Sequence, residues 1–460
     1  MDYPLAYYTC DGQENLFFHL LDVDEGLMCL VIFPDQTTLL FDCNLTDDKE
    51  EEISKYLGRE IPFRLDDETE EMSQWIDVFV NSHRDDDHYR GLSKVHEKFP
   101  IRSIWDSGQT GATTQSTDYQ YYMSLRRSLR EKYGENAVIV PSPSKYPLKT
   151  LGNVNVYCLN SSLDYSDEVR SLTMKKFLEF VEKGIFKEGK IQHTNSIVLS
   201  INYDRRVLML PGDSDYLAWR DKIMPNFKGT GLLKTNILVA SHHGSRSFFT
   251  DENENDTIDP EENPDTTYVE HIDEIAPSIV LMPCGEYNSA HHPNEAALKI
   301  YKENTPNEQV YTTHTRGTFA GFINKNGAWT VVPSRFFPKT NIKRNFRIKC
   351  ICYNRGTQYE GKSGEVFPIG SSLHFSVQSN FGILDPINEV SVIWEVSNGG
   401  VSSDHEHQEI YYKGKTESAP KQEFEREVAY HGTHLLRCYV NNKKKKIRAT
   451  QIFVVRGEHT

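Results

Sequence analysis

The sequence lacks the marks of a disulfide scaffold, a zinc ribbon and a membrane protein. Its eight cysteines are scattered and form no C-x-x-C pair, which is typical of a reducing compartment, where we expect free and buried thiols. No apolar run approaches the ~18 residues that cross a bilayer. The first residues, MDYPLAYYTCDGQ, lack the basic start and apolar centre of a signal peptide. We therefore expect a soluble, cytoplasmic protein with no membrane partner.

Positive charge is also in short supply. The chain has 51 lysines and arginines against 66 aspartates and glutamates, which gives a formal net charge of −15. Nucleic acids and membrane surfaces are polyanions, so this charge disfavours their non-specific attraction. A substrate that contains phosphate would have to be attracted locally, by bound metal ions.

The length of 460 residues predicts more than one domain, because it exceeds a single ordinary core. Up to about residue 340, strand-like and helix-like segments are interleaved, and the first three strands are expected to form an antiparallel meander. The expected strands are 15–24, 27–33, 37–44, 75–81, 153–159, 195–213, 235–245 and 277–285, and the expected helices are 119–133, one near 171–183, and 293–304.

The composition changes after residue 345. From residue 346 onward every apolar segment is strand-like and none has helical spacing, which is the pattern of a small β-sandwich. The sequence therefore predicts an α/β domain over residues 1–340 and an all-β domain over residues 345–457. The boundary is expected at 339–345.

The loop that follows the strand at 75–81 has an unusual density of polar groups. It reads VNSHRDDDHYRGL over residues 80–92, and contains His83, Asp85, Asp87 and His88. Alternate residues in a tight strand-to-helix turn can converge on one point, and imidazole and carboxylate groups are metal ligands. A solvated connection between two elements is the alternative interpretation of this loop taken alone.

Further polar clusters stand at the ends of other apolar strands. Asp213 ends one strand, the pair His242 and His243 ends the next, and His292 precedes a helix. Strand ends on one side of an α/β layer are where sites assemble. His193 stands just before a strand, where a hydrogen-bonded structural histidine is the alternative. Together the clusters predict one shared site.

These motifs resemble the metallo-β-lactamase fold. SHRDDDHYRGL is similar to its first metal motif, H-x-H-x-D-H, in the form S-H-x-D-x-D-H of the soluble hydrolase domain of ComEC-type competence proteins. The opening strands that end in FDCN, the hairpin that ends in VLMLPGD, and the segments SHHGS, AHHP and TTHTRGTFAGFINKNG resemble later parts of the same fold. The resemblance covers about residues 14–333 and implies an αββα sandwich.

The resemblance also implies two divalent metal ions and a role for each polar residue. The implied ligands are His83, Asp85 and His193 for one ion, Asp87, His88 and either His242 or His243 for the other, and Asp213 as a bridge. The implied catalytic residues are Asp87, His243 and His292, and the two histidines could donate a proton to the leaving group or contact phosphate. Asp42 is interpreted as a structural carboxylate behind the ligands.

Two positions depart from the family pattern. Asp24 and Glu25 stand where the family has glycine and glutamine, and Asp85 replaces the second histidine of the general motif. A carboxylate ligand shifts the preference towards harder ions. We therefore expect zinc or manganese, with magnesium as a further candidate.

Two C-terminal segments, VIWEVSNGG and FEREVAYHGTHLLRCYVNN, carry a second resemblance. They resemble the adenylyl/guanylyl cyclase and SMODS C-terminal sensor (AGS-C) domain, which implies an immunoglobulin-like sandwich that senses a nucleotide or a phage-derived signal. The implied sensor residues are Trp394, Glu427, Tyr430 and His434. A buried tryptophan and a corner tyrosine are also ordinary core features of such a sandwich.

Three functions are consistent with these patterns. The first is a metal-dependent phosphodiesterase, a DNA nuclease of bacterial anti-phage defence that the sensor domain regulates. The second is a hydrolase of a small cyclic nucleotide signal. The third is a non-catalytic sensor or interaction protein on a degenerate lactamase fold, which clustered buried carboxylates disfavour. Expected partners are a nucleic acid or nucleotide substrate, a nucleotide or phage-derived activator, and a second copy of the chain or a product of the same defence operon.

Overall fold

The computed structural model describes residues 15–66, 71–108, 116–163, 192–252, 254–285, 292–333, 347–379, 382–383, 390–397, 423–429, 432–442 and 447–458. The chain forms two compact units. The N-terminal unit comprises Gly12–Ile61 and Trp75–Arg335, whereas the C-terminal unit is formed mainly by Phe336–Thr460 and includes Pro62–Gln74. The expected boundary at 339–345 lies outside the described residues, so the predicted division stays a prediction.

In the described part of the N-terminal unit, eight strands form the first sheet. Their order is β10 (Val138–Ile139), β9 (Ile101–Asp106), β7 (Ile76–Asn81), β3 (Thr38–Phe41), β2 (Cys29–Ile32), β1 (Asn15–Leu20), β18 (Phe319–Asn324) and β19 (Trp329–Pro333). β1, β2 and β3 pair antiparallel, as the meander prediction requires. β7 lies parallel between β3 and β9, and its register pairs Asn81 with Asp106.

A second sheet of the same unit contains seven strands within the described residues. Their order is β11 (Lys149–Leu151), β12 (Val154–Asn160), β13 (Val198–Tyr203), β14 (Arg206–Leu210), β15 (Ile237–Val239), β16 (Ile279–Met282) and β17 (Val310–Thr312). β13 and β14 form the expected antiparallel hairpin. β14 to β17 are parallel, so their carboxyl ends lie along one edge.

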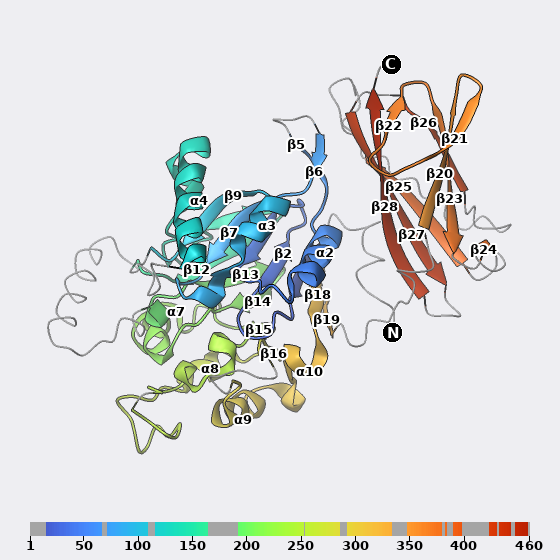
Figure 1. The fold of residues 1–460 in the computed structure, drawn as a ribbon. Coiled ribbons are helices and arrows are strands. Elements are labelled where there is room, and N and C mark those ends of the chain that lie inside the picture. The colour runs from blue at the N-terminus through green and yellow to red at the C-terminus, as the bar shows by residue number, and fades with distance from the viewer. Residues whose placement is uncertain are drawn as a thin grey trace. The chain divides into compact units, whose positions relative to one another are not determined.

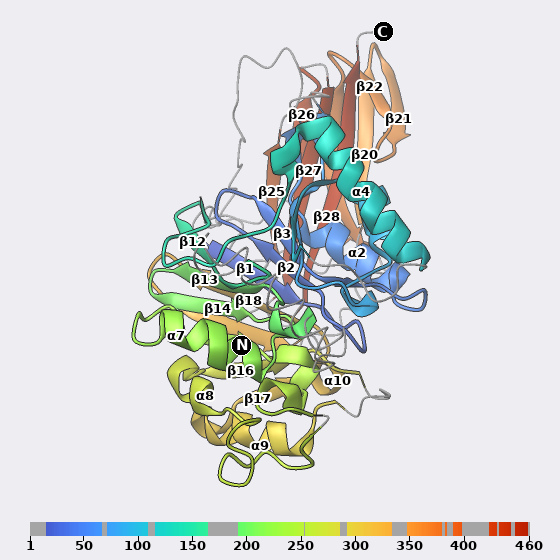
Figure 2. The ribbon, with the colours of Figure 1, turned by 90° about the vertical axis from the view of Figure 1, so that its left-hand side faces the viewer.

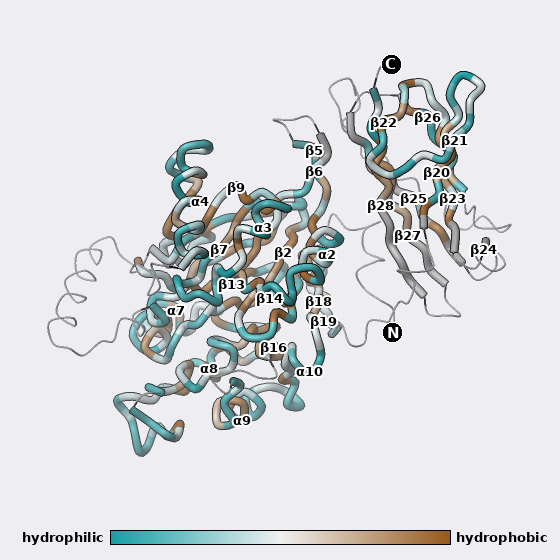
Figure 3. Tube along the Cα trace, in the orientation of Figure 1, coloured by the Kyte–Doolittle hydropathy of each residue, from teal (hydrophilic) through white to brown (hydrophobic). Residues whose placement is uncertain are grey.

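The two sheets share an apolar core and carry helices on their outer faces. Phe18 of β1 and Leu199 of β13 belong to this common core. The outer face of the first sheet is covered by α2 (Glu50–Glu60), α3 (Leu92–Lys98) and α4 (Thr117–Tyr133), and that of the second by α7 (Met224–Phe227), α8 (Glu270–Ile275) and α9 (Glu295–Glu303) (Figures 1 and 2). Apolar residues concentrate in the strands between these helices (Figure 3). The unit is a four-layer α/β structure.

Local sequence explains where the helices begin and end. The Ser116 side chain accepts a hydrogen bond from the Tyr119 backbone at the start of α4, and Gly134 ends the helix with a φ of 88°. Tyr122 and Leu125, which have helical spacing, face the sheet. The helices expected at 119–133 and 293–304 correspond to α4 and α9, while α2 and α8 were not expected. The helix predicted near 171–183 lies outside the described residues.

The C-terminal unit consists of strands wherever it is described. One sheet contains β20 (Arg347–Asn354), β21 (Thr357–Gly361), β23 (Ser372–Ser379), β24 (Gly382–Ile383) and β26 (Glu423–Glu427), and the other contains β22 (Val366–Pro368), β25 (Val390–Ser397), β27 (Gly432–Asn442) and β28 (Ile447–Glu458). Both sheets contribute to one apolar core, for example through Phe375 and Phe453. The hairpin of β5 (Arg64–Asp66) and β6 (Glu71–Ser73) belongs to the segment assigned to this unit, which the sequence pattern did not predict.

The described cysteines agree with the expectation of free, buried thiols. The cysteines at 29, 43, 158, 284, 350, 352 and 438 are free and buried. Among the described residues, no helix has both the length and the apolar character needed to span a membrane.

Candidate metal centre

The predicted ligands come from strand ends that the two sheets bring together. The loop with His83 and His88 follows β7 of the first sheet. Asp213 follows β14, and His242 and His243 follow β15, its parallel neighbour in the second sheet. Because parallel strands place their carboxyl ends at one edge, these segments can meet at a common point.

His193 reaches the same edge from the opposite chain direction. It precedes β13, which is antiparallel to β14, so the amino end of β13 lies beside the carboxyl end of β14. Gly212 sits at this junction with a φ of 55°, and a Cβ there would overlap Ser196 and Ser82. A glycine is therefore required where the Asp213 turn passes between the segments that carry His193 and His83.

The first triad consists of His83, Asp85 and His193. The Asp85 carboxylate Oδ2 is 3.3 Å from His83 Nε2 and 3.2 Å from His193 Nε2. His83 is fully buried, and the ligand atoms of all three residues lie within 4.8 Å of one another. The structure thus places His193, for which the sequence left a structural role as the alternative, directly against the Asp85 carboxylate.

The second triad consists of Asp87, His88 and His243. Asp87 Oδ2 is 3.6 Å from His88 Nε2 and 3.3 Å from His243 Nε2. These three ligand atoms also lie within 4.8 Å of one another. The two triads draw on successive parts of the loop, because residues 83 and 85 belong to one and residues 87 and 88 belong to the other.

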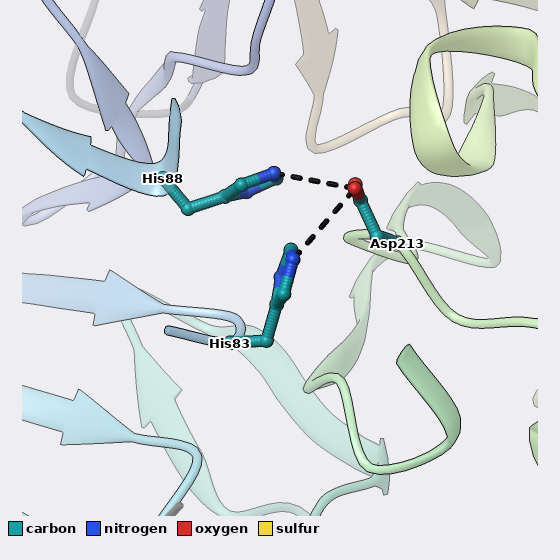
Figure 4. Close-up of side chains that lie close together, drawn as sticks. All are labelled: His83, His88 and Asp213. Atoms are coloured by element: carbon teal, nitrogen blue, oxygen red, sulfur yellow. Dashed lines mark ion pairs between the residues drawn. The ribbon is translucent and has the colours of Figure 1, made fainter. Parts of the chain in front are cut away.

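Asp213 lies between the two triads. Its Oδ2 is 3.7 Å from His83 Nε2 and 3.3 Å from His88 Nε2, and both rings point towards it (Figure 4). The same oxygen is 3.7 Å from His243 Nε2. A single carboxylate that faces histidines of both groups has the position of a bridging ligand.

The donor set fits divalent metal ions. The Nε2 atoms of His83, His88 and His243 are buried and have no hydrogen-bond partner among the described residues, although they face carboxylates. A tetrahedral ion with bonds of about 2.0–2.2 Å separates its ligand atoms by about 3.3–3.6 Å. The nitrogen–oxygen distances of 3.2–3.6 Å in the triads match this spacing. The residues therefore form groups that could hold metal ions.

Hydrogen bonds behind the ligands orient the rings. The Asp42 Oδ2 atom is 2.7 Å from His88 Nδ1, and Asp42 Oδ1 accepts a 2.7 Å hydrogen bond from the Ser82 backbone. His243 Nδ1 donates to the Pro283 carbonyl at 3.1 Å, which leaves its Nε2 as the lone-pair atom. Fixing Nδ1 in this way is how proteins select the metal-binding nitrogen of a histidine. Asp42 thus lies behind His88, and its role as a structural carboxylate behind a metal ligand stays a prediction.

Three polar residues of the centre have left-handed backbone conformations. The φ angles are 56° for Asp42, 46° for His242 and 55° for His243. This conformation costs free energy for a residue other than glycine, and it persists only where the surroundings enforce it. The two successive residues direct their side chains to different neighbours, His242 to His193 and His243 to Asp87.

His242 belongs beside the first triad rather than in the second. Its Nε2 is 3.6 Å from Asp213 Oδ2, and it forms a possible ligand group with His193 and Asp213. Its Nδ1 is 2.7 Å from the Ser247 hydroxyl. Burial lowers the pKa of His242 well below its ordinary value despite Asp213, so the ring is neutral at pH 7. His243, by contrast, is the member of the pair that faces Asp87.

The electrostatics of the centre favour positive charge. Burial acts to lower the pKa of His193, but Asp85 and Asp213 outweigh it and raise this pKa to about 9. Burial also opposes the charged form of His88, whose pKa is nevertheless raised by Asp213 and Asp42. Burial would raise the pKa of Asp213, yet the surrounding histidines hold it well below its usual range. The field of the buried carboxylates therefore attracts cations.

His292 lies next to the ligands. Its ring centroid is 5.3 Å from that of His242 and 6.2 Å from that of His243. It is partly buried and none of the ligand groups includes it. Its neighbour His291 lies outside the described residues. His292 thus lies at the border of the centre, and its catalytic role stays a prediction.

The sensor residues expected in the C-terminal unit are placed less uniformly. Trp394 is only 1 % exposed, and its ring stacks on Phe424 with a centroid distance of 5.9 Å, so it lies in the core rather than on a ligand-binding face. Glu427 is exposed, and with His434 it lines a small cavity of about 40 Å³ between the two sheets. Phe375 and Phe424 form part of its apolar wall. Tyr430 lies outside the described residues.

Residues 328–456 match the family model of the adenylyl/guanylyl and SMODS C-terminal sensor domain. The resemblance of the C-terminal region is thereby confirmed. A sensor domain of this type implies a nucleotide-type ligand and indicates a nucleotide-signalling or defence-related protein. A comparison with curated proteins gave no match to the chain. The metallo-β-lactamase resemblance of the N-terminal region is not tested by these comparisons and stays a prediction.

Three residues in or behind the centre were not selected from the sequence. Ser82 donates its hydroxyl to Asp42 at 2.7 Å, and Arg84 pairs at 2.9 Å with Asp106, which ends β9. Asp106 stands at the carboxyl end of an apolar strand, as Asp213 does, and this position was the available signal. It was missed because a single aspartate without a neighbouring histidine does not indicate a ligand.

Proposed function

We propose that the protein is a metal-dependent phosphodiesterase with a metallo-β-lactamase-type αββα sandwich, which acts as a DNA nuclease in bacterial phage defence. We also infer that its C-terminal, immunoglobulin-like sandwich regulates this activity. The observation that carries the proposal is the pair of histidine–aspartate triads on either side of Asp213, with buried Nε2 atoms that lack hydrogen-bond partners among the described residues.

The residues of the centre would hold two divalent ions. His83, Asp85 and His193 would bind one, with His242 as an additional ligand, while the second triad would bind the other and Asp213 would be shared. When bound, two such metal ions supply Lewis acidity and local positive charge for the attack of water on a phosphodiester. The formal net charge of −15 would make the chain itself repel a polyanionic substrate. The local positive charge of the bound ions would offset this repulsion at the centre.

Protein groups would then position the reactants and transfer protons. Each triad carries a carboxylate at its outer side, Asp85 or Asp87, which can accept a hydrogen bond from an incoming water. His292 lies within ring-contact distance of His242 and is not a member of the ligand groups found among the described residues, so it is our candidate for protonating the leaving oxygen. His242 is less suited to this step, because its neutral ring faces Asp213.

Hydrolysis of a small cyclic nucleotide is the second candidate. The observation in its favour is the sensor domain, which implies a nucleotide-type ligand in the same chain as the candidate hydrolase. A hydrolase that removes the signal would end the response, whereas a nuclease that receives the signal would carry it out. Both use the same phosphodiester chemistry, and they differ in the size of the substrate.

The first experiment tests the centre and its substrate. Purified protein should carry or bind about two divalent ions per chain, and a chelator should abolish hydrolysis. The loaded protein is incubated with plasmid, linear single-stranded DNA, RNA and cyclic dinucleotides, and the products are separated by size. Asp87→Ala with His88→Ala should remove the activity and leave the folded state intact. A wild-type protein that carries no stoichiometric metal, and whose activity a chelator does not reduce, would contradict the proposal.

The second experiment tests control by the sensor domain. A shift of an enzyme from about 1 % to 99 % active requires roughly 5.5 kcal/mol of differential binding by the signal. The full chain alone should therefore be nearly inactive, and nucleotides or phage lysate should activate it. Glu427→Ala with His434→Ala, which changes two residues that line the cavity, should alter this response without altering metal content. Equal rates for wild type and variant under every condition would mean that the C-terminal unit has another role.

A further inference from the structure

A buried ionic cluster lies behind the loop of the candidate metal centre. Its central residue is Asp106, which is fully buried at the end of β9. Asp106 Oδ1 accepts hydrogen bonds from Arg84 Nη2 at 2.9 Å and from the Gly108 backbone at 2.6 Å. Its Oδ2 is paired with Arg126 Nε at 2.7 Å and accepts a hydrogen bond from the Tyr122 hydroxyl. Both carboxylate oxygens therefore have cationic partners.

Arg84 connects this cluster to the first triad. It stands between His83 and Asp85, and its side chain is 5 % exposed. In extended backbone, successive side chains point in opposite directions, and Asp85 has extended angles of φ −88° and ψ 150°. His83 and Asp85 can thus face the metal position while Arg84 is held from behind. A movement of the backbone at His83 or Asp85 would therefore also displace the Arg84 guanidinium from Asp106.

Helix α4 holds the other side of the cluster and touches the same loop at further points. It supplies Tyr122 and Arg126 to Asp106. The Tyr122 ring stacks on Tyr89 at a centroid distance of 5.6 Å, just after the second triad. The Asp118 carboxylate accepts a 3.1 Å hydrogen bond from the Gly91 backbone, where the loop ends. The helix therefore fixes the loop both at Arg84 and at its end.

We propose that Asp106 is a positioning residue for the candidate metal centre, which sets the geometry of the first triad through Arg84. This inference rests on the proposed two-metal function. The second triad depends less on the cluster, because Asp42 and the Pro283 carbonyl orient His88 and His243 independently. Loss of the Arg84–Asp106 pair should therefore weaken one ion position selectively.

The test compares variants of the full chain. Asp106→Asn and Arg84→Gln break the pair from its two ends, and Arg84→Gln leaves Asp106 compensated by Arg126. Tyr122→Phe is the matched control, because it removes one hydrogen bond to the same carboxylate but keeps both the Arg84 contact and the stacked ring. Stepwise manganese affinities are measured by calorimetric titration, and His193→Ala and His243→Ala identify which step belongs to which triad.

We expect Asp106→Asn and Arg84→Gln to weaken the first-triad step by about 10–100-fold, the usual effect of losing an outer partner of a metal ligand. The second-triad step should change less than about threefold, and Tyr122→Phe should retain both. If Asp106→Asn does not fold, Arg84→Gln decides the matter. Unchanged affinities in folded variants, or an equal loss at both steps, would overturn the positioning role. A wild type that binds no metal would instead refute the proposed function.

Discussion

The buried histidines of the candidate metal centre differ from His271, another buried histidine of the N-terminal unit, in what faces their ring nitrogens. At the candidate metal centre, the Nε2 atoms of His83, His88 and His243 face carboxylate oxygens at 3.3–3.7 Å. His271 is equally buried, and neither of its ring nitrogens has a hydrogen-bond partner among the described residues. Burial and missing hydrogen-bond partners among the described residues are thus common to the centre and to His271. What distinguishes the centre is the convergence of carboxylates.

The surroundings of His271 consist of aromatic rings. Trp219 stacks on it at a centroid distance of 5.1 Å, and Phe248 contacts it edge to face at 4.4 Å. Burial lowers the pKa of His271 to about 3, whereas the carboxylates raise the pKa of His193 to about 9. The same side chain is therefore held neutral in one place and charged in the other. Only the second environment can attract a cation.

The strongest way to break this contrast is to remove the shared carboxylate. Asp213→Asn takes away the charge that faces histidines of both triads. We expect loss of stoichiometric metal and a fall in hydrolysis larger than the about 10–100-fold typical of outer partners. Elemental analysis and rate measurements on the folded variant check this. Metal content equal to that of the wild type would contradict a bridging position.

A smaller effect is expected from the supporting shell. Asp42→Asn keeps a hydrogen-bonding group near His88 Nδ1 but removes the negative charge at 2.7 Å. Metal affinity should fall by about 10–100-fold, because the neutral amide no longer makes the ligand more basic. The loss should be concentrated in the second triad, which contains His88. A titration in which the loss of affinity appears in the first-triad step would contradict the assignment of Asp42 to the second ion.

The smallest effect on the metal centre is expected from the aromatic cluster. The unfolded chain binds a proton at His271 near pH 6.5, but the folded chain does so only near pH 3. Between these values the unfolded state holds more protons, so the free energy of unfolding falls as the pH falls, by up to about 1.4 kcal/mol per unit. His271→Phe should remove this contribution.

Chemical denaturation at pH 7 and pH 5 measures the difference directly. The wild type should lose more free energy of unfolding between these pH values than the His271→Phe variant, while both bind the same amount of metal. A variant with reduced metal content would show that the aromatic cluster also supports the centre. An identical pH response of the two proteins would show that His271 is protonated more easily than its surroundings indicate.

The local pattern of the sequence determined much of the candidate site. The alternation of His83, Asp85 and Asp87 follows from the turn itself, and the strand-end positions of Asp213 and the 242–243 pair follow from apolar runs that are visible in the chain. The helix α4 was predictable as well, because its apolar residues repeat with helical spacing and Ser116 and Gly134 mark its ends. Such features depend on neighbours within a few residues, which a sequence displays directly.

Only the tertiary structure decided how these pieces are used. His243 rather than His242 faces Asp87 because of two successive left-handed backbone angles, and Trp394 lies in a core instead of on a face. The Arg84–Asp106 pair joins neighbouring strands across 22 positions of the chain, and Asp42 reaches His88 across 46. Contacts of this kind form when sheets pair and helices pack on them. Their partners are therefore set by the register and layering of the whole unit, which no short stretch of sequence contains.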